Sequence, residues 1–120
     1  MSAQPHRRRL EVENLGDVTV VCFTDRKILV EQSIQAIGEQ LQNLVSESGG
    51  KKLLLNFRNV EYMSSAVLGM LVTLNKKIQM AGRKLVLCNI DPQIREVFAI
   101  TKLDKVFVIR GEEQEALQAF

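Results

Sequence analysis

The sequence has few of the side chains that most catalytic and metal sites require. It contains one histidine, His6, two cysteines, Cys22 and Cys88, and no tryptophan. Because His6 lies in a polar N-terminal segment, the rest of the chain lacks the histidines that a histidine-based zinc site or a Ser-His triad requires. Cys88, at the end of an expected strand, is the one candidate nucleophile, and no histidine in the folded body could activate it. We therefore expect no enzyme activity, no cofactor and no metal.

The two cysteines also limit the redox chemistry. Each lies within an apolar run, and a disulfide framework or a zinc site needs more cysteines or a closer spacing. The pattern predicts buried, reduced thiols on neighbouring strands.

Long apolar runs and glycine-rich loops are missing as well. No apolar run approaches the roughly 20 residues needed to cross a bilayer, and residues 1–9 contain no apolar core of a signal peptide. Neither Gly-x-Gly-x-x-Gly nor Gly-x-x-x-x-Gly-Lys-Ser/Thr occurs, so the usual phosphate-cradling loops are absent. We expect a cytoplasmic protein that does not associate with a membrane.

An excess of positive charge is found only in the N-terminal segment. The net charge is +2, and Arg7, Arg8 and Arg9 supply +3 of it, which leaves −1 for the rest of the chain. This distribution argues against a nucleic-acid-binding surface. The arginine triplet is either a solvated tail or a contact for an acidic partner or a lipid headgroup.

Hydrophobic periodicity predicts alternating strands and helices. Strands are expected over 10–15, 18–23, 53–57, 85–90 and 106–109, where apolar residues alternate or run continuously. An apolar stripe from Val30 to Val45, closed by Gly49-Gly50, predicts the first helix. Further helices are expected over 65–80, from Asp91-Pro92 onward, and over 112–120.

The order of these elements defines a fold class. It reads β-β-α-β-α-β-α-β-α, and strands separated by helices imply right-handed parallel crossovers. We expect one α/β domain over residues 8–120, preceded by a flexible tail over residues 1–7. Its central sheet has about five mostly parallel strands with an antiparallel hairpin at the N-terminus, and about four helices pack against the sheet.

Two adjacent serines, Ser64 and Ser65, stand where a strand and a polar turn lead into the second long helix. A hydroxyl at this position can cap the helix by accepting a backbone N–H bond, which contributes about 1 kcal/mol. It can also carry a phosphate, which the unpaired N–H groups and the helix dipole would stabilise. The two uses are compatible, and the sequence leaves both open.

Three stretches of the chain resemble the STAS domain of bacterial anti-sigma factor antagonists. They are a strand followed by Thr24-Asp25-Arg26 and a long amphipathic helix, the segment from Leu54 to Gly69, and the segment from Lys84 to Phe98 followed by Leu103-Asp104. The resemblance covers about residues 8–120. It implies a STAS fold, and it implies a partner that is both an anti-sigma factor and a serine kinase. A serine phosphatase is a further partner compatible with this resemblance.

The resemblance also suggests site residues. Family members usually read Asp-Ser-Ser/Thr-Gly-Leu-Gly at the helix corner, which places Ser65 at the phosphoacceptor position with Ser64 as the alternate. Asp25 matches the aspartate that usually follows the second strand. The implied partner-binding surface comprises Thr24, Asp25, Arg26, Met63, Ser64, Ala66 and Val67.

The chain departs from the family motif at three positions. Ser64 replaces the aspartate, and Ala66 and Val67 replace the second hydroxyl residue and the glycine. Val67 is bulkier than glycine and is expected to narrow the approach of a partner. The alternative interpretation is a constitutive STAS scaffold of a signalling or transport complex, in which the serines act only as helix caps.

Overall fold

The structure is a computed structural model that describes residues 10–47 and 52–120. The tail predicted over residues 1–7, the domain start at residue 8 and the helix end predicted at Gly49-Gly50 lie outside these ranges.

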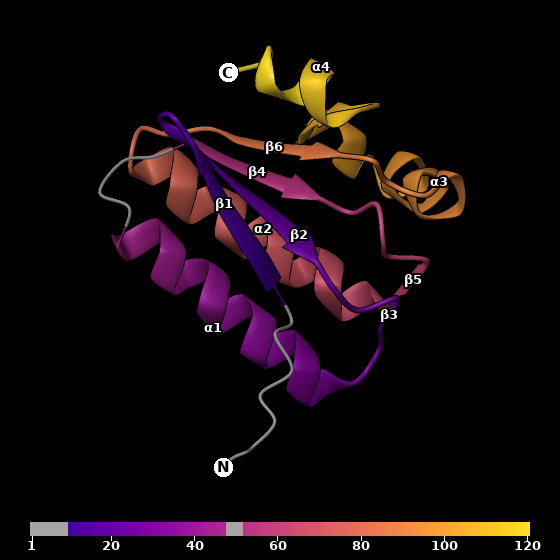
Figure 1. The fold of residues 1–120 in the computed structure, drawn as a ribbon. Coiled ribbons are helices and arrows are strands. Elements are labelled where there is room, and N and C mark those ends of the chain that lie inside the picture. Colours follow the sequence, from indigo (N-terminus) through magenta and orange to yellow (C-terminus); the bar gives the residue numbers. More distant parts are fainter. Residues whose placement is uncertain (1–9, 48–51) are drawn as a thin grey trace.

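Five strands form the main sheet, and Figure 1 shows its twist. Their spatial order is β1-β2-β4-β6-β7. β1 runs antiparallel to β2, and the remaining pairs are parallel, which confirms the predicted hairpin and mostly parallel sheet. The strands are β1 (Leu10–Leu15), β2 (Val18–Phe23), β4 (Lys52–Asn56), β6 (Leu85–Cys88) and β7 (Val108–Arg110).

Two very short strands form a second, unpredicted sheet. β3 (Lys27–Ile28) pairs in parallel with β5 (Tyr62–Met63). Two residues are too few to show the alternation by which strands are recognised in a sequence, so periodicity could not have revealed this pairing. It links the chain after β2 to the chain before the second long helix.

The helices cover the two faces of the sheet unequally. Figure 1 shows α1 and α2 side by side against one face and the short α4 over the other. The single turn η1 of 3-10 helix follows α3. The helical elements are α1 (Glu31–Glu47), α2 (Ser65–Met80), α3 (Pro92–Ile100), η1 (Leu103–Lys105) and α4 (Glu113–Leu117).

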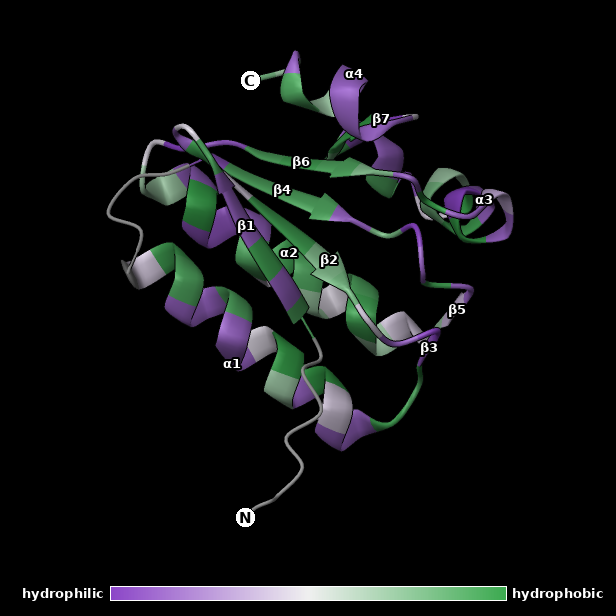
Figure 2. Cartoon of the chain, in the orientation of Figure 1, coloured by the Kyte–Doolittle hydropathy of each residue, from purple (hydrophilic) through white to green (hydrophobic). Residues whose placement is uncertain are grey.

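The hydrophobic core consists of two clusters, because alternate side chains of each strand point to opposite faces of the sheet. Val21 and Phe23 of β2 join the large cluster beneath α1 and α2, whereas Val18 and Val20 join a smaller cluster beneath α4. Figure 2 shows the resulting green, hydrophobic colour along β2, β4 and β6. Leu117 and Phe120, whose environment the sequence left open, pack against the smaller cluster.

The structure corrects several predicted details. Cys22 and Cys88 do not lie on neighbouring strands, because Asn56 of β4 pairs with both and separates them. β6 ends at Cys88 because Asn89 takes a left-handed conformation (φ 54°). The turn η1 displaces the last strand to Val108–Arg110, and α4 ends at Leu117.

Candidate functional site

Ser65 is the first residue of α2 and its side chain is exposed. The start of α2 is fixed by the minor sheet, because the N–H of Ser64 donates to the carbonyl oxygen of Ile28 (3.0 Å). The position of Ser65 therefore depends on the pairing of β3 with β5, which holds the beginning of the helix at the edge where the parallel strands end.

The N-terminus of α2 has an open positive end. Its first turn, all of it described, contains no acidic residue, and no side chain caps it. By contrast, Asp91 caps α3 by accepting from the N–H of Gln93 (2.9 Å). Unpaired N–H groups and the helix dipole at an uncapped start favour an anion.

Ser64 occupies the N-cap position, but its hydroxyl does not cap the helix. Its backbone is extended (φ −79°, ψ 163°), and its carbonyl oxygen accepts the N–H of Val67 (3.0 Å). The Ser64 Oγ atom is buried and finds no hydrogen-bond partner among the described residues. The predicted capping bond is therefore not formed by Ser64, and its oxygen is less accessible than that of Ser65.

The segment after β2 reaches the same corner, as the sequence suggested. The N–H groups of Glu61 and Tyr62 both donate to the carbonyl oxygen of Arg26 (2.8 and 3.2 Å). The Arg26 Nε atom also lies 2.9 Å from a carboxylate oxygen of Glu61. Thr24 is exposed and Asp25 is half-buried in this segment.

Three expected contact residues differ sharply in exposure. Ala66 is exposed and Met63 is half-buried, so both can contribute to a surface. Val67 is fully buried (0% exposed). The prediction that the Val67 side chain contacts a partner and narrows its approach is wrong, because the helix turns this side chain into the core beneath α2.

Three apolar residues at the corner were missed. Leu29 and Val30, between β3 and α1, are 52% and 60% exposed, and Tyr62 is 48% exposed. The Lys27 ammonium lies 5.5 Å from the centre of the Tyr62 ring, a distance suited to a cation–π contact. The sequence concealed the exposure of Val30 because this residue is spaced as the first member of the apolar stripe of the first helix, whereas α1 starts only at Glu31. No pattern in the sequence singled out Leu29.

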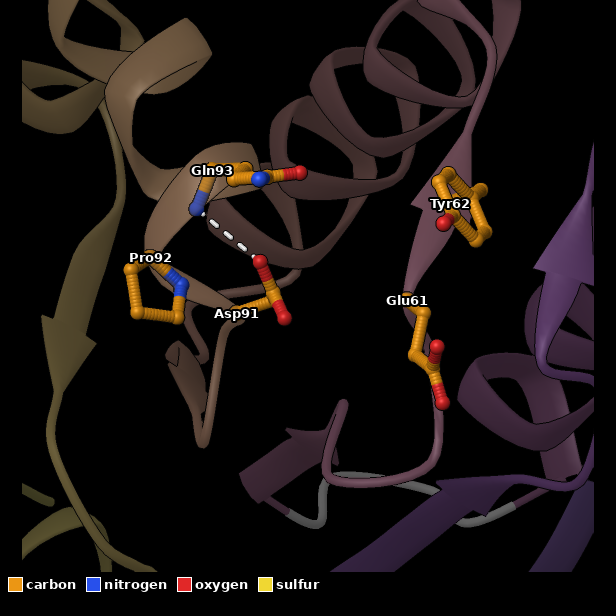
Figure 3. Close-up of a pocket in the computed structure, with 5 residues that line it drawn as sticks. All are labelled: Glu61, Tyr62, Asp91, Pro92 and Gln93. Carbon is orange, nitrogen blue, oxygen red and sulfur yellow. Dashed lines mark hydrogen bonds between the residues drawn. The ribbon is translucent and has the colours of Figure 1, made fainter.

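A hollow adjoins this corner. Figure 3 shows Glu61 and Tyr62 facing Asp91, Pro92 and Gln93 across an open space. The volume of this hollow is about 370 Å³. Asp91 is half-buried, and one of its oxygens is occupied by the N–H of Gln93. Two carboxylates thus border the hollow.

The cysteines offer little reactivity. Burial raises the pKa of Cys88 to about 12, and burial likewise raises the pKa of Cys22. Neither thiol is an activated nucleophile at neutral pH. No group of three or more potential metal ligands occurs within residues 10–47 and 52–120. Among the helices of that same part of the chain, none is long and apolar enough to span a bilayer.

Comparison with known proteins places the chain in a family. The STAS domain profile matches residues 9–116. The protein BtrV of Bordetella bronchiseptica, whose name gives it provisionally as an anti-sigma factor antagonist, is 30% identical over 93% of this chain and 94% of its own.

Solved structures agree with this assignment. An anti-sigma-factor antagonist (STAS) domain protein from Planctomyces limnophilus superposes with a TM-score of 0.83 at 26% identity, covering 92% of this chain and 96% of that one. SpoIIAA of Bacillus in its phosphorylated form gives a TM-score of 0.69 at 16% identity, covering 92% and 97%, a likeness of fold alone. The fold, the match over residues 9–116 and the relatives together identify this chain as a member of the STAS domain family.

Proposed function

We propose that this protein is an anti-sigma factor antagonist that binds an anti-sigma factor with serine kinase activity. We further propose that phosphorylation of Ser65 ends this complex. The observation that carries the proposal is the exposed hydroxyl of Ser65 at the uncapped start of α2. The name of BtrV supports the class of function, and the choice of Ser65 rests on the geometry of this chain.

The unmodified corner suits a protein partner. Its exposed apolar side chains are those of Leu29, Val30 and Tyr62, which belong to the two segments joined by the minor sheet before α2. They give a partner hydrophobic area to bury. The segment 24–26 and Ala66 extend the surface on either side. A kinase bound here would have the Ser65 hydroxyl within its interface.

Phosphorylation would change this surface without unfolding it. A phosphate of about −2 at Ser65 faces the N–H groups of the first turn, which can hold it in place. Of the two cations beside this corner, Arg26 is already paired with Glu61 and the Lys27 ammonium lies against the Tyr62 ring. The phosphate therefore adds net negative charge to an interface built around apolar groups, and desolvating that charge disfavours rebinding.

Ser65 is a better acceptor than Ser64, because a kinase must reach the oxygen it modifies. The Oγ of Ser64 is buried, and Ser65 is exposed. The scaffold alternative assigns the serines to helix capping, and the absence of a capping bond from Ser64 speaks against that role. The proposed partner is cytoplasmic, and a serine phosphatase would reverse the modification.

Calorimetric titration of the chain with its cognate anti-sigma factor tests the proposal. Ser65→Asp is expected to weaken binding at least about tenfold, and Ser65→Ala is expected to bind whether or not ATP is present. Ser46→Asp, at an exposed serine near the C-terminal end of α1, is the matched control. It should bind like the protein without a substitution. Equal affinity of Ser65→Asp and Ser46→Asp would refute the switch.

A further inference from the structure

The C-terminal end of α2 and the turn after it carry a concentration of positive charge. The sequence from Lys76 to Lys84 contains four cations and no carboxylate. Lys76, Lys77 and Lys84 are exposed, and Arg83 is half-buried. We call these four residues the basic end of α2. Figure 1 shows α2 running from the corner beside β3 and β5 to the opposite end of the sheet.

The turn after α2 gathers these cations at one place. The N–H of Gly82 donates to the carbonyl oxygen of Gln79 (2.9 Å). The N–H of Arg83 donates to the carbonyl oxygen of Ile78, also at 2.9 Å. This pair of bonds forms a Schellman motif, which requires the left-handed backbone that Gly82 adopts (φ 77°). Arg83 and Lys84 are therefore folded back against the end of the helix that carries the other two lysines.

The neighbouring strand ends do not neutralise this charge. Asp17, beside the start of β4, lies 2.9 Å from the Lys52 ammonium, so these two charges offset each other. The Lys84 ammonium donates to the carbonyl oxygen of Ala119, and the Lys77 ammonium donates to a side-chain amide oxygen of α1 (3.0 Å). Both acceptors are uncharged. Within the described residues no ion pair joins the basic end of α2 to a carboxylate, so its four positive charges can attract an outside partner.

An apolar side chain protrudes from the same end of the helix. Met80, the last residue of α2, is 88% exposed. It follows Lys77 by three residues and Lys76 by four, so the three side chains share one side of the helix. The favourable interaction of a lysine with the negative end of the helix dipole accounts for Lys77 in the last turn. It accounts neither for Met80 nor for the two cations that follow the helix.

A partner for this surface must be anionic and must also accept an apolar side chain. A folded protein would need a hollow of matching shape for the protruding Met80, whereas a layer of lipid headgroups adapts to it. Anionic headgroups complement clusters of four or more lysines and arginines, and the acyl boundary beneath them accepts apolar side chains. The combination of charge and a protruding methionine therefore favours a bilayer surface over an acidic protein or a nucleic acid.

We propose that the basic end of α2 binds the surface of an anionic membrane, with Met80 inserted between the headgroups. Four cations are at the lower limit of the clusters that recognise such membranes, so the contact is weak and falls as salt rises. α2 has 16 residues, a length of about 24 Å, and Ser65 lies at its other end. A bound copy therefore keeps the corner at Ser65 accessible, and the proposal is independent of the function proposed for Ser65. The missing membrane-spanning segment, from which we expected no membrane association, does not bear on a contact with the membrane surface.

Tryptophan fluorescence of the full chain tests the contact directly. The chain has no tryptophan, so Met80→Trp places a single reporter at the proposed contact. With vesicles of equal parts phosphatidylglycerol and phosphatidylcholine, we expect its emission to shift to shorter wavelength. Vesicles of phosphatidylcholine alone should cause no shift, because they carry no net negative charge. Ile100→Trp, at a 74% exposed apolar position on α3, is the matched control and should respond to neither vesicle.

Co-sedimentation of the chain with the same anionic vesicles tests the charges. Lys76→Glu with Lys84→Glu should lower the partition coefficient at least about tenfold, and Met80→Ser should lower it at least about threefold. Arg95→Glu with Lys105→Glu, at exposed positions of α3 and η1, is the charge-matched control. It should bind like the protein without a substitution.

Two kinds of result would overturn the proposal. The first is equal binding of the two charge-reversed variants, or a fluorescence shift at both tryptophans or at neither. The second is binding of duplex DNA or of a polyglutamate peptide that depends on Lys76 and Lys84, without binding of the vesicles, which would assign the basic end of α2 to another anion.

Discussion

Two adjacent serines at the start of α2 occupy opposite environments. The backbone N–H of Ser64 donates to the carbonyl oxygen of Ile28, and the Ser64 hydroxyl is buried without a partner among the described residues. Ser65 begins the helix and faces solvent. Burial of the Ser64 hydroxyl is therefore unfavourable for stability, whereas the Ser65 hydroxyl is available for modification.

Removal of the Ser64 hydroxyl should not destabilise the protein. A capping serine replaced by alanine costs about 1 kcal/mol, but the Ser64 hydroxyl makes no capping bond, and its burial is itself unfavourable. We expect Ser64→Ala to leave the free energy of unfolding in urea unchanged or slightly raised. Asp91→Ala, which removes a cap that is formed, should lose about 1 kcal/mol. Equal losses in both variants would contradict this account.

The Cys88 thiol should be inert in the folded protein. Burial raises its pKa from 9.0 to about 12, so at pH 8 the thiolate is roughly a thousandfold rarer than in an unfolded chain. In a Cys22→Ala background, we expect native labelling by a disulfide reagent to be at least about a hundredfold slower than labelling in urea. Comparable native and unfolded rates would show that Cys88 is accessible.

The same pKa difference predicts a pH dependence of stability. Between pH 9 and about 12 the unfolded thiol has lost its proton and the folded thiol retains it, so the folded state binds more protons. The free energy of unfolding therefore falls as pH rises through this window, and it is unaffected by this group below pH 9. Urea titrations at several pH values, with Cys88→Ala as the reference, isolate the contribution.

At the scale of secondary structure, a buried amide joins three elements at the carboxyl edge of the sheet. Asn56, 1% exposed at the end of β4, donates to Glu113 of α4 (3.0 Å). Its oxygen accepts from the N–H of Arg58 (3.0 Å) and from the side-chain amide of Asn89 after β6 (3.2 Å). The bond to Glu113 ties the start of α4 to the sheet, and the bond from Asn89 links β4 to the residue that follows β6.

Substitution of Asn56 should therefore loosen α4. Asn56→Ala leaves several part-buried polar groups without this partner, and we expect a loss of about 2–3 kcal/mol in the free energy of unfolding. Faster hydrogen exchange of α4 amides should accompany it. Asn14→Ala, which removes a single bond from Thr19 at the edge strand, should lose less than about 1 kcal/mol. Similar losses for both, with α4 exchange unchanged, would contradict the proposed link.

The elements that the sequence predicted correctly are those with strong periodicity. α2 shows it clearly, because Val67, Leu71, Leu74 and Ile78 recur at helical spacing and are all buried. The minor sheet of β3 and β5 could not be predicted, because two-residue strands carry no periodic signal. The end of β6 depends on the left-handed conformation of Asn89, which the apolar run through Ile90 concealed.

At the scale of the whole molecule, the helices that cover the sheet leave open the corner where we propose that a partner binds. α1 and α2 cover one face and α4 lies over the other, while the corner at the start of α2 stays open (Figure 1). The family resemblance pointed to this corner and to Ser65. It could not indicate that Leu29, Val30 and Tyr62 are exposed there, since exposure depends on how β3 and β5 hold the adjoining loops.

Mapping the phosphate added by the cognate kinase tests the central claim most directly. After incubation with kinase and ATP, peptide mass spectrometry should show one phosphate on Ser65 in the protein without a substitution and in Ser64→Ala. It should show no phosphate in Ser65→Ala. A phosphate on Ser64, or no phosphate at either serine while the kinase binds the protein, would contradict the account.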